Sequence, residues 1–164
     1  MIYAIVAVDN DYGIGFKNQL LEHIPEDLKL FKTLTTDNTV IMGYNTWNSL
    51  PVKPLPRRKN IVVTFEKAVN TPDVLYMTLD EAKKYAEDNE AEEEIFIIGG
   101  GMMYKEFLPM CDYVFLTKIF TTHEDIDTYF PNIELMDNWE CIEKGIMNTY
   151  KDIQYQFQLY RNNY

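Results

Sequence analysis

The sequence has only two cysteines and two histidines, and it contains no long apolar run. Cys111 and Cys141 form no CxxC pair and His23 and His123 are isolated, so we expect reduced thiols and no metal site. No apolar stretch approaches the ~20 residues that span a bilayer. The opening residues lack a basic region and a small-residue cleavage site, so they predict a strand rather than a signal peptide. These absences favour a cytoplasmic protein.

The length and composition suit one domain, residues 1–164, with one hydrophobic core. Domains commonly contain ~100–150 residues, and this chain has 164, of which 46% are apolar. No long apolar stripe indicates a dimer, so we expect a monomer. The formal net charge of −11 argues against binding to nucleic acid or to an anionic membrane.

Acidic residues are absent from one long stretch of this acidic chain. Residues 38–65 contain no Asp or Glu, whereas residues 87–94 hold six of them. A cationic stretch in an acidic protein favours an anionic ligand, although a basic loop without a ligand fits the charge equally well. The stretch carries four cations: Lys53, Arg57, Arg58 and Lys59.

Short segments rich in branched residues predict strands, and two local signals mark helix starts. Pro25 suits the first turn of a helix, and Thr78 with Glu81 matches a capping box. We expect helices at 25–34, 46–50, 79–89 and 102–108. We expect strands at Ile2–Val8, Thr39–Gly43, 60–65, Val74–Met77, 94–98, 113–120, 139–143 and 153–160.

The order of these segments predicts an α/β fold. Early strands alternate with helices, which is typical of a mostly parallel sheet with helices on both faces. The last strand alternates apolar and polar residues, as an antiparallel strand near an edge does. We therefore expect a single-domain, mostly parallel eight-stranded sheet that ends in an antiparallel C-terminal hairpin. Ligands of such sheets bind beyond the carboxyl ends of the strands.

Asp27 is the first candidate for chemistry. It lies beside the apolar stripe of the first predicted helix, four residues before Phe31. A carboxylate against an apolar surface is costly unless a partner stabilises it, which favours a functional role. An acid in the first turn of a helix is also common simply because it complements the helix dipole. Both interpretations remain open from the spacing alone.

Two further segments place small and polar groups directly after strands. The run from Gly99 to Gly101 precedes a helix, whose free N–H groups suit a phosphate, although a plain tight turn has the same pattern. Gly43 is followed by Asn45 and Thr46 in the same arrangement. Each signal is weak alone, but together with Asp27 they suggest one ligand site.

An ordered set of motifs resembles the dihydrofolate reductase family over the whole chain. The resemblance implies the family's fold and a hydride transfer from NADPH to dihydrofolate; NADH as a weaker alternative donor follows from a departure from the family described below. The motifs include Gly13-Ile14-Gly15, Pro25-Glu26-Asp27-Leu28, Val40-Ile41-Met42-Gly43, Thr46-Trp47, Pro54-Leu55-Pro56, Arg58-Lys59-Asn60, Ile98-Gly99-Gly100-Gly101 with Tyr104, and Asp127-Thr128 with Phe130-Pro131.

The resemblance implies a substrate site around Asp27, the expected catalytic residue. Asp27 would bond to the pteridine with support from Thr117, and Arg58 would bind the carboxylate of the glutamate tail. Ile5 and Ile98 would offer carbonyl groups. The remaining implied substrate contacts are the apolar residues Leu28, Phe31 and Leu50, the cations Lys32 and Lys53, and Tyr104.

The resemblance implies a cofactor site along three segments. Ala7, Ile14, Gly15, Asn18 and Tyr104 would lie near the nicotinamide and its ribose, and Asn45 and Thr46 near the pyrophosphate. Thr64 and Phe65 would lie near the adenine. The other implied cofactor contacts are Gly43, Tyr44, Gly99, Gly100, Gly101, Met102 and Met103.

The chain departs from the family's bacterial pattern at two places. Leu21-Glu22 replaces the usual Pro-Trp, and we expect Glu22 to be exposed, with entry into the site as a second carboxylate as the alternative. The positions around the adenosine have no cation, although Thr64 could donate a hydrogen bond and Lys67 could reach in. We therefore expect weaker discrimination between NADPH and NADH. These cation-free positions are Tyr44, Phe65, Met77 and Met102.

Two rival functions remain. A related reductase of the same fold, such as that of riboflavin synthesis, fits Asp27, Thr117 and Arg58 less well because they suit a pterin with a glutamate tail. A non-catalytic ligand-binding relative is the second rival.

Overall fold

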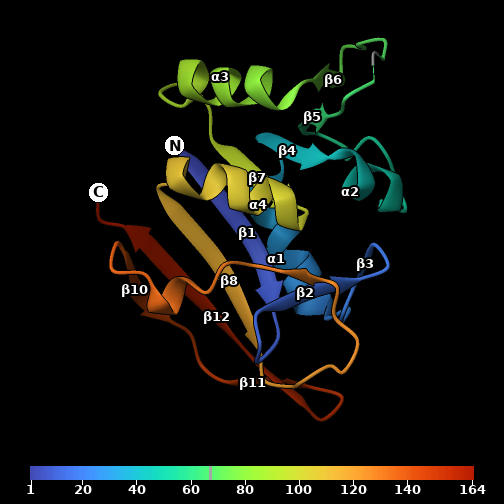
Figure 1. Ribbon diagram of the computed structural model, residues 1–164. Coiled ribbons are helices and arrows are strands. Elements are labelled where there is room, and N and C mark those ends of the chain that lie inside the picture. Colours follow the sequence, from blue (N-terminus) through green and yellow to red (C-terminus); the bar gives the residue numbers. More distant parts are fainter. Residues whose placement is uncertain (67) are drawn as a thin grey trace.

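The computed structural model describes residues 1–66 and 68–164, and a large mixed sheet is its centre (Figure 1). Nine strands form this sheet: β1 (Ile2–Val8), β4 (Thr39–Gly43), β5 (Lys59–Val63), β6 (Val74–Met77), β7 (Ile95–Gly99), β8 (Tyr113–Ile119), β10 (Trp139–Lys144), β11 (Asn148–Tyr150) and β12 (Ile153–Asn162). Their order is β10-β12-β8-β1-β7-β4-β5-β6, and β11 pairs with β12.

The sheet is parallel from β8 to β6 and antiparallel at its C-terminal end. β1 pairs in parallel with both β7 and β8, and β4 does so with β5 and β7. β12 runs antiparallel to β8, β10 and β11. The predicted α/β fold and antiparallel C-terminal strands are therefore confirmed. The short strand β11 was not predicted. It has only three residues, and its pairing with β12 depends on the turn at Lys151 and Asp152, where the backbone φ is positive.

Helices cover both faces of the sheet (Figure 1). The helical segments are α1 (Pro25–Thr35), α2 (Tyr44–Ser49), α3 (Leu79–Asn89), α4 (Gly101–Phe107) and two single 3-10 turns, η1 (Leu108–Met110) and η2 (Ile133–Leu135). Residues of α3 and α4 share one buried cluster, whereas residues of α1 and α2 pack in a second cluster. No helix in the described residues has the length and apolar character needed to cross a membrane.

Strand β1 shows how the sequence separates the two faces. Its even-numbered residues are all buried in the α3–α4 cluster, whereas Tyr3 and Ile5 pack with the α1–α2 cluster. Side chains of a strand alternate between faces, so a strand covered on both sides is apolar throughout. The apolar run at the start of the sequence reflects this central position.

The predicted starts of α1 and α3 are confirmed. Pro25 occupies the first turn of α1. Before α3, the Thr78 hydroxyl accepts from the Glu81 N–H at 3.2 Å, and the Glu81 carboxylate accepts from the Thr78 N–H at 2.9 Å. The start of α2 was predicted two residues too late, because Gly43 precedes its first turn and no side chain caps it.

A second, three-stranded sheet was not predicted. It contains β2 (Gly13–Phe16), β3 (Gln19–Leu20) and β9 (Thr128–Tyr129) in the order β3-β2-β9. Two of these strands have only two residues, which is too short for an alternation pattern to be visible. The sheet pairs β2, in the segment after β1, with β9, in the segment after β8.

Candidate active site

Asp27 lies in the first turn of α1 and contacts Thr117 on β8. The Thr117 hydroxyl donates to Asp27 Oδ1 at 2.6 Å, although 90 residues separate the two in the chain. Burial raises the pKa of Asp27, and the Thr117 hydrogen bond opposes this shift without cancelling it. The pairing predicted for these two residues is thus present, and it leaves a second carboxylate oxygen for another partner.

Tyr104 is held against the central strand. Its hydroxyl donates to the Ile5 carbonyl at 2.7 Å, and its ring meets Phe130 edge-on with centroids 5.1 Å apart. Burial raises the pKa of Tyr104, and the negative charge of Asp27 adds to the effect. The tyrosine is therefore a neutral donor, and the Ile5 carbonyl already accepts one hydrogen bond.

Apolar side chains border Asp27 on the α1 side. Leu28 follows it and keeps 45% of its surface exposed, although it is a leucine on a packed helix. Leu50, Ile5 and Ile98 pack against the α1–α2 cluster and are only partly buried. Phe31 is half-buried one turn further along α1. These residues together form an apolar surface that stays open beside a carboxyl group.

A cavity of about 310 Å³ lies on the β12 side of Asp27. Its lining includes Ile5 and Thr117, the residue whose hydroxyl bonds to Asp27. Leu30 and Phe157 are among its apolar lining residues. Its volume accommodates several water molecules, each of which occupies ~30 Å³ in the liquid.

The glycines after β7 lie close to the start of α2. Gly99 has a φ of 125°, a backbone conformation that favours glycine. A methyl group added to Gly99 or Gly100 would lie 3.5 Å from the Thr46 hydroxyl, and one added to Gly43 would lie 3.3 Å from Met103. A methyl group added to Gly43 would also lie 3.9 Å from backbone atoms of Gly99 and Gly100, so the backbones at the ends of β4 and β7 approach each other closely.

The predicted cationic stretch is partly neutralised in the fold. Arg57 pairs with Asp37 at 2.7 Å, and Lys59 lies 4.0 Å from Glu93. Both acids come from outside the acid-free stretch, so the linear pattern could not reveal them. Two of the four cations in the stretch therefore have acidic partners.

Arg58 differs from its neighbours because it is half-buried next to α1. Its Nη1 donates to the Thr35 hydroxyl at 3.1 Å, and its Nε donates to the Pro56 carbonyl at 2.9 Å. Within the described part of the chain, no carboxylate lies within 4.0 Å of it. Lys32 and Lys53 are exposed on α1 and after α2. Arg58 is consequently the fixed cation on this side of the site.

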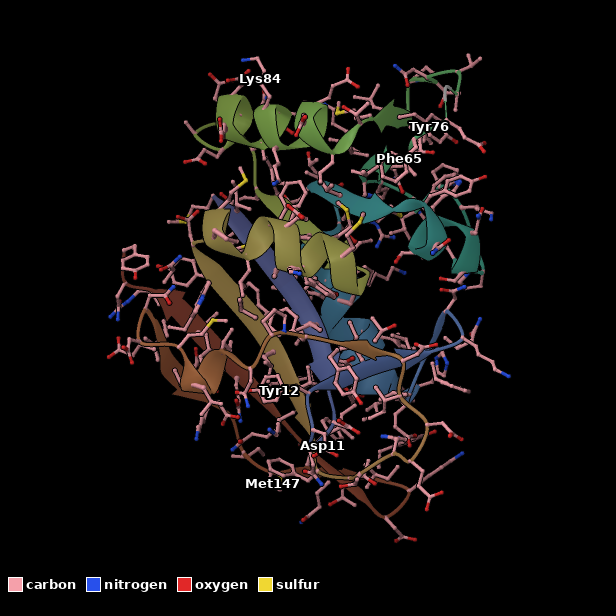
Figure 2. The ribbon with its side chains drawn as sticks, in the orientation of Figure 1. Asp11, Tyr12, Phe65, Tyr76, Lys84 and Met147 are labelled. Carbon is pink, nitrogen blue, oxygen red and sulfur yellow. The ribbon has the colours of Figure 1, made fainter. Side chains whose placement is uncertain are left out.

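The residues expected near the adenosine are mostly exposed. Phe65 keeps 88% of its surface exposed just beyond β5, and Figure 2 shows it with Tyr76 at the β5–β6 edge of the molecule. Thr64 is buried, and its hydroxyl accepts from the Glu66 N–H at 3.2 Å. Lys67 lies outside the described residues. Also exposed are Tyr44, Asn45 and Met102, whereas Met77 is half-buried.

Other residues expected at the cofactor differ in their placement. Met103 in α4 is 1% exposed and packs in the α3–α4 cluster, so its side chain faces the core. Ile14 is also buried, and Ala7 is half-buried. Gly15 pairs with both neighbours in the small sheet, and Asn18 is exposed in the β2–β3 turn with a φ of 62°.

Glu22 has a partner that the sequence did not reveal. Its Oε1 lies 3.0 Å from His123 Nε2, and His123 Nδ1 lies 3.0 Å from Asp9 Oδ2. The expected free exposure of Glu22 is therefore wrong, since its side chain is 29% exposed and held by a histidine. No spacing signal links these residues, because 101 positions separate Glu22 from His123.

Comparisons with known proteins agree with this geometry. The model of the family "Dihydrofolate reductase" matches residues 1–162. Dihydrofolate reductases of Buchnera aphidicola (pea-aphid strain) and Bacillus subtilis are 35% and 34% identical, over 96% and 98% of this chain and 97% and 94% of theirs. A structure of the Enterococcus faecalis dihydrofolate reductase, complexed with NADP(H) and RAB-propyl, superposes with a TM-score of 0.86. It is 33% identical and covers 100% of this chain and 97% of its own. The chain belongs to the dihydrofolate reductase family.

Proposed function

We propose that the chain reduces 7,8-dihydrofolate to 5,6,7,8-tetrahydrofolate, with NADPH as the hydride donor and Asp27 as the catalytic residue. The hydride goes to C6 of the pteridine and a proton to N5. The observation that carries the proposal is the hydrogen bond between Thr117 and Asp27, which places one half-buried carboxyl group beside an open apolar surface. Membership of the family supplies the reaction.

Asp27 orients the pteridine and makes it more basic. Its Oδ1 accepts from Thr117, so Oδ2 is free to accept from the amino group or a ring nitrogen of the pteridine. Because its pKa is raised, the carboxyl group changes protonation state closer to neutral pH than an exposed aspartate does. The proton reaches N5 through water, and the cavity beside Thr117 is a source of that water. Asp27 therefore orients the pteridine and does not itself deliver the proton to N5.

The rest of the substrate matches the apolar surface and the fixed cation. Leu28, Phe31 and Leu50 suit the aromatic rings, and the exposed surface of Leu28 becomes buried when a ring lies on it. Arg58 suits the carboxylate of the glutamate tail, because its planar guanidinium can donate two parallel hydrogen bonds. Lys53 adds a positive charge at the same end.

The residues after β4 and β7 fit a dinucleotide. Gly43 approaches the glycine run closely, and the Thr46 hydroxyl lies beside Gly99 and Gly100, so backbone N–H groups and a hydroxyl are near each other where a phosphate would bind. NADPH supplies the hydride when it is bound. The chain's own residues align the two rings and exclude water from the contact between them.

Selectivity for the cofactor's 2′-phosphate is weak in this proposal. The side chains proposed around the adenosine are Tyr44, Phe65, Met77 and Met102, and none of them is cationic. Thr64 is the polar group among them, and its hydroxyl oxygen already accepts from Glu66. A dianionic phosphate loses more water here than the side chains replace, so NADH remains a usable second donor.

The proposed enzyme is a monomer in the cytoplasm. Two free cysteines, one of them the buried Cys111, fit a reducing compartment. Light scattering during size-exclusion chromatography tests the monomer, for which a mass near 19.4 kDa is expected.

The direct test follows the loss of NADPH absorbance on addition of dihydrofolate. Steady turnover supports the proposal. Turnover of a pyrimidine intermediate of riboflavin synthesis with no turnover of dihydrofolate would favour the rival reductase of the same fold. Ligand binding without turnover of either substrate would favour a non-catalytic relative.

A further inference from the structure

The imidazole ring of His123 lies between two carboxylates from distant parts of the chain. Asp9 follows β1, Glu22 lies between β3 and α1, and His123 belongs to the segment between β8 and β9. Each ring nitrogen is 3.0 Å from a carboxylate oxygen. The backbone N–H of His123 also donates to the Asp9 carboxylate at 3.2 Å. The ring therefore connects three segments. We call Asp9, His123 and Glu22 the histidine bridge.

The histidine bridge requires a protonated ring. An ionised carboxylate only accepts hydrogen bonds, and a neutral imidazole has a single N–H to donate. Only the imidazolium can donate to Asp9 and Glu22 together. Burial lowers the pKa of His123, but its hydrogen bonds to Glu22 and Asp9 outweigh burial, so the net shift is upward. The bridge is complete below this raised pKa, and one of its two hydrogen bonds is lost as the pH rises through it.

Asp9 is ionised throughout this range. Burial raises its pKa, but hydrogen bonds from His123 and from the N–H groups of Gly13 and Asp11 outweigh burial and give a net lowering. Figure 2 shows Asp11 in the β1–β2 turn. In the described part of the chain, Asp9 and Glu22 are the acidic partners of the ring. Besides His123, the titratable groups on the three segments beside the ring are Asp9, Asp11, Tyr12, Glu22, His23, Glu124, Asp125 and Asp127.

The histidine bridge is the outermost of three contacts between the same two stretches of chain. Two residues after Glu22, Ile24 shares a buried cluster with Ile119. The Ile24 carbonyl then accepts the N–H of Asp27 at 3.0 Å and starts α1. The hydrogen bond from β8 to Asp27 is the third contact. A displacement of Glu22 would therefore be transmitted through Ile24 to the start of the helix that carries the catalytic carboxyl group of Asp27.

We propose that His123 is a positioning residue for the reduction: its ring anchors Glu22 to Asp9 and so fixes the segment that leads into the helix of Asp27. The proposal rests on the proposed function, because it assigns the consequence of the bridge to dihydrofolate binding. When the ring loses its proton, the segment from Gln19 to Ile24 loses one anchor, and the affinity for dihydrofolate falls. This dependence on pH is separate from the titration of Asp27.

A titration of His123 by NMR tests the bridge without any substrate, and His23→Gln assigns its signal. His123 is expected to titrate at a higher pH than a free histidine side chain, because its hydrogen bonds to Glu22 and Asp9 outweigh its burial. Glu22→Gln is expected to lower the His123 pKa by removing one negative charge. A His123 pKa at or below that of a free histidine, or no response to Glu22→Gln, would overturn the proposal whether or not the chain reduces dihydrofolate.

Steady-state kinetics test the consequence for the reaction. His123→Gln and Glu22→Gln are expected to raise KM for dihydrofolate by about threefold to tenfold below the His123 pKa, as expected for a lost charge-assisted hydrogen bond. In both variants KM no longer changes with pH where the wild-type KM rises, while the pH dependence of kcat is retained. His23→Gln is the matched control and keeps the wild-type KM profile.

A purely structural role predicts a different result. In that case the variants lose thermal stability, and the pH dependence of KM stays as in the wild type, which would overturn the proposal. Glu22→Gln is the more informative variant because Glu22 is partly exposed and its replacement is close to isosteric.

Discussion

Thr117 donates a 2.6 Å hydrogen bond to Asp27 and thereby joins β8 to the first turn of α1. The bond uses one carboxylate oxygen and leaves the other for a ligand. It also limits how far burial raises the Asp27 pKa. The pair therefore sets both the direction of the carboxyl group and the pH range in which it is ionised.

Asp27→Asn is expected to reduce kcat/KM at neutral pH by about a hundredfold or more, the contribution typical of a positioned acid or base. Activity should recover partly in acid, where protons from water are abundant. A pH series of kcat/KM with dihydrofolate measures both effects. Unchanged activity at neutral pH would contradict the role of Asp27.

The same substitution should increase the free energy of unfolding at neutral pH. Because the Asp27 pKa is raised in the folded chain, ionising this group destabilises the fold as the pH rises through the folded pKa. Below the unfolded pKa this cost is absent, so the advantage of asparagine should disappear in acid. Urea unfolding of both proteins at neutral and acidic pH checks the sign.

Thr117→Val keeps the shape of the side chain and removes its hydroxyl. Because the hydroxyl lowers the Asp27 pKa, its loss should raise that pKa further and shift the pH profile of hydride transfer upward. The lost bond to a carboxylate should also weaken transition-state binding by about 1.5–3 kcal/mol. Single-turnover rates across pH measure the shift, and an unmoved profile would mean that the hydroxyl does not control Asp27.

Arg58→Gln should raise KM for dihydrofolate by about tenfold to a hundredfold with little change in kcat, because it removes a contact made equally before and during the reaction. A pterin substrate without the glutamate tail should be unaffected. Arg57→Gln is the matched control, since Arg57 is exposed and paired with Asp37. Equal effects of the two substitutions would remove the special role of Arg58.

Cofactor preference is the fifth expectation. The ratio of kcat/KM for NADPH to that for NADH should lie below about a thousandfold, or ~4 kcal/mol, because Tyr44, Phe65, Met77 and Met102, the side chains proposed around the 2′-phosphate, are not cationic. Phe65→Arg should increase the ratio by supplying a charge-assisted hydrogen bond, and Phe65→Leu should not. A larger wild-type ratio would show that another group, such as Lys67, binds the phosphate.

The sequence could predict those parts of the site that lie next to regular elements. Asp27 follows Pro25 at the start of α1, and the glycine run follows a buried strand, so local patterns located both. Spacing alone left Asp27 open to a plain helix-dipole role. Only the ordered motif set favoured a functional role for Asp27, because that set relates several strands at once.

Long-range pairings were beyond local patterns. The partners of Arg57 and Lys59 are Asp37 and Glu93, and neither lies in the stretch whose charge suggested a ligand. The two isolated histidines also looked alike, although one lies between two carboxylates and the other is exposed. Such contacts depend on strand order, which determines which loops meet.

The position of β1 has a consequence for how the chain folds. Its sheet partners are β7 and β8. Ile2 pairs with Ile95 and Tyr3 with Tyr113, and both partners are synthesised much later. On a ribosome, the first strand to emerge therefore gains its neighbours only after about two-thirds of the chain has been made. Such non-local pairing slows folding and keeps an apolar strand exposed to other chains. We expect the nascent chain to need protection from aggregation until β8 emerges, and that is also when Asp27 first meets Thr117.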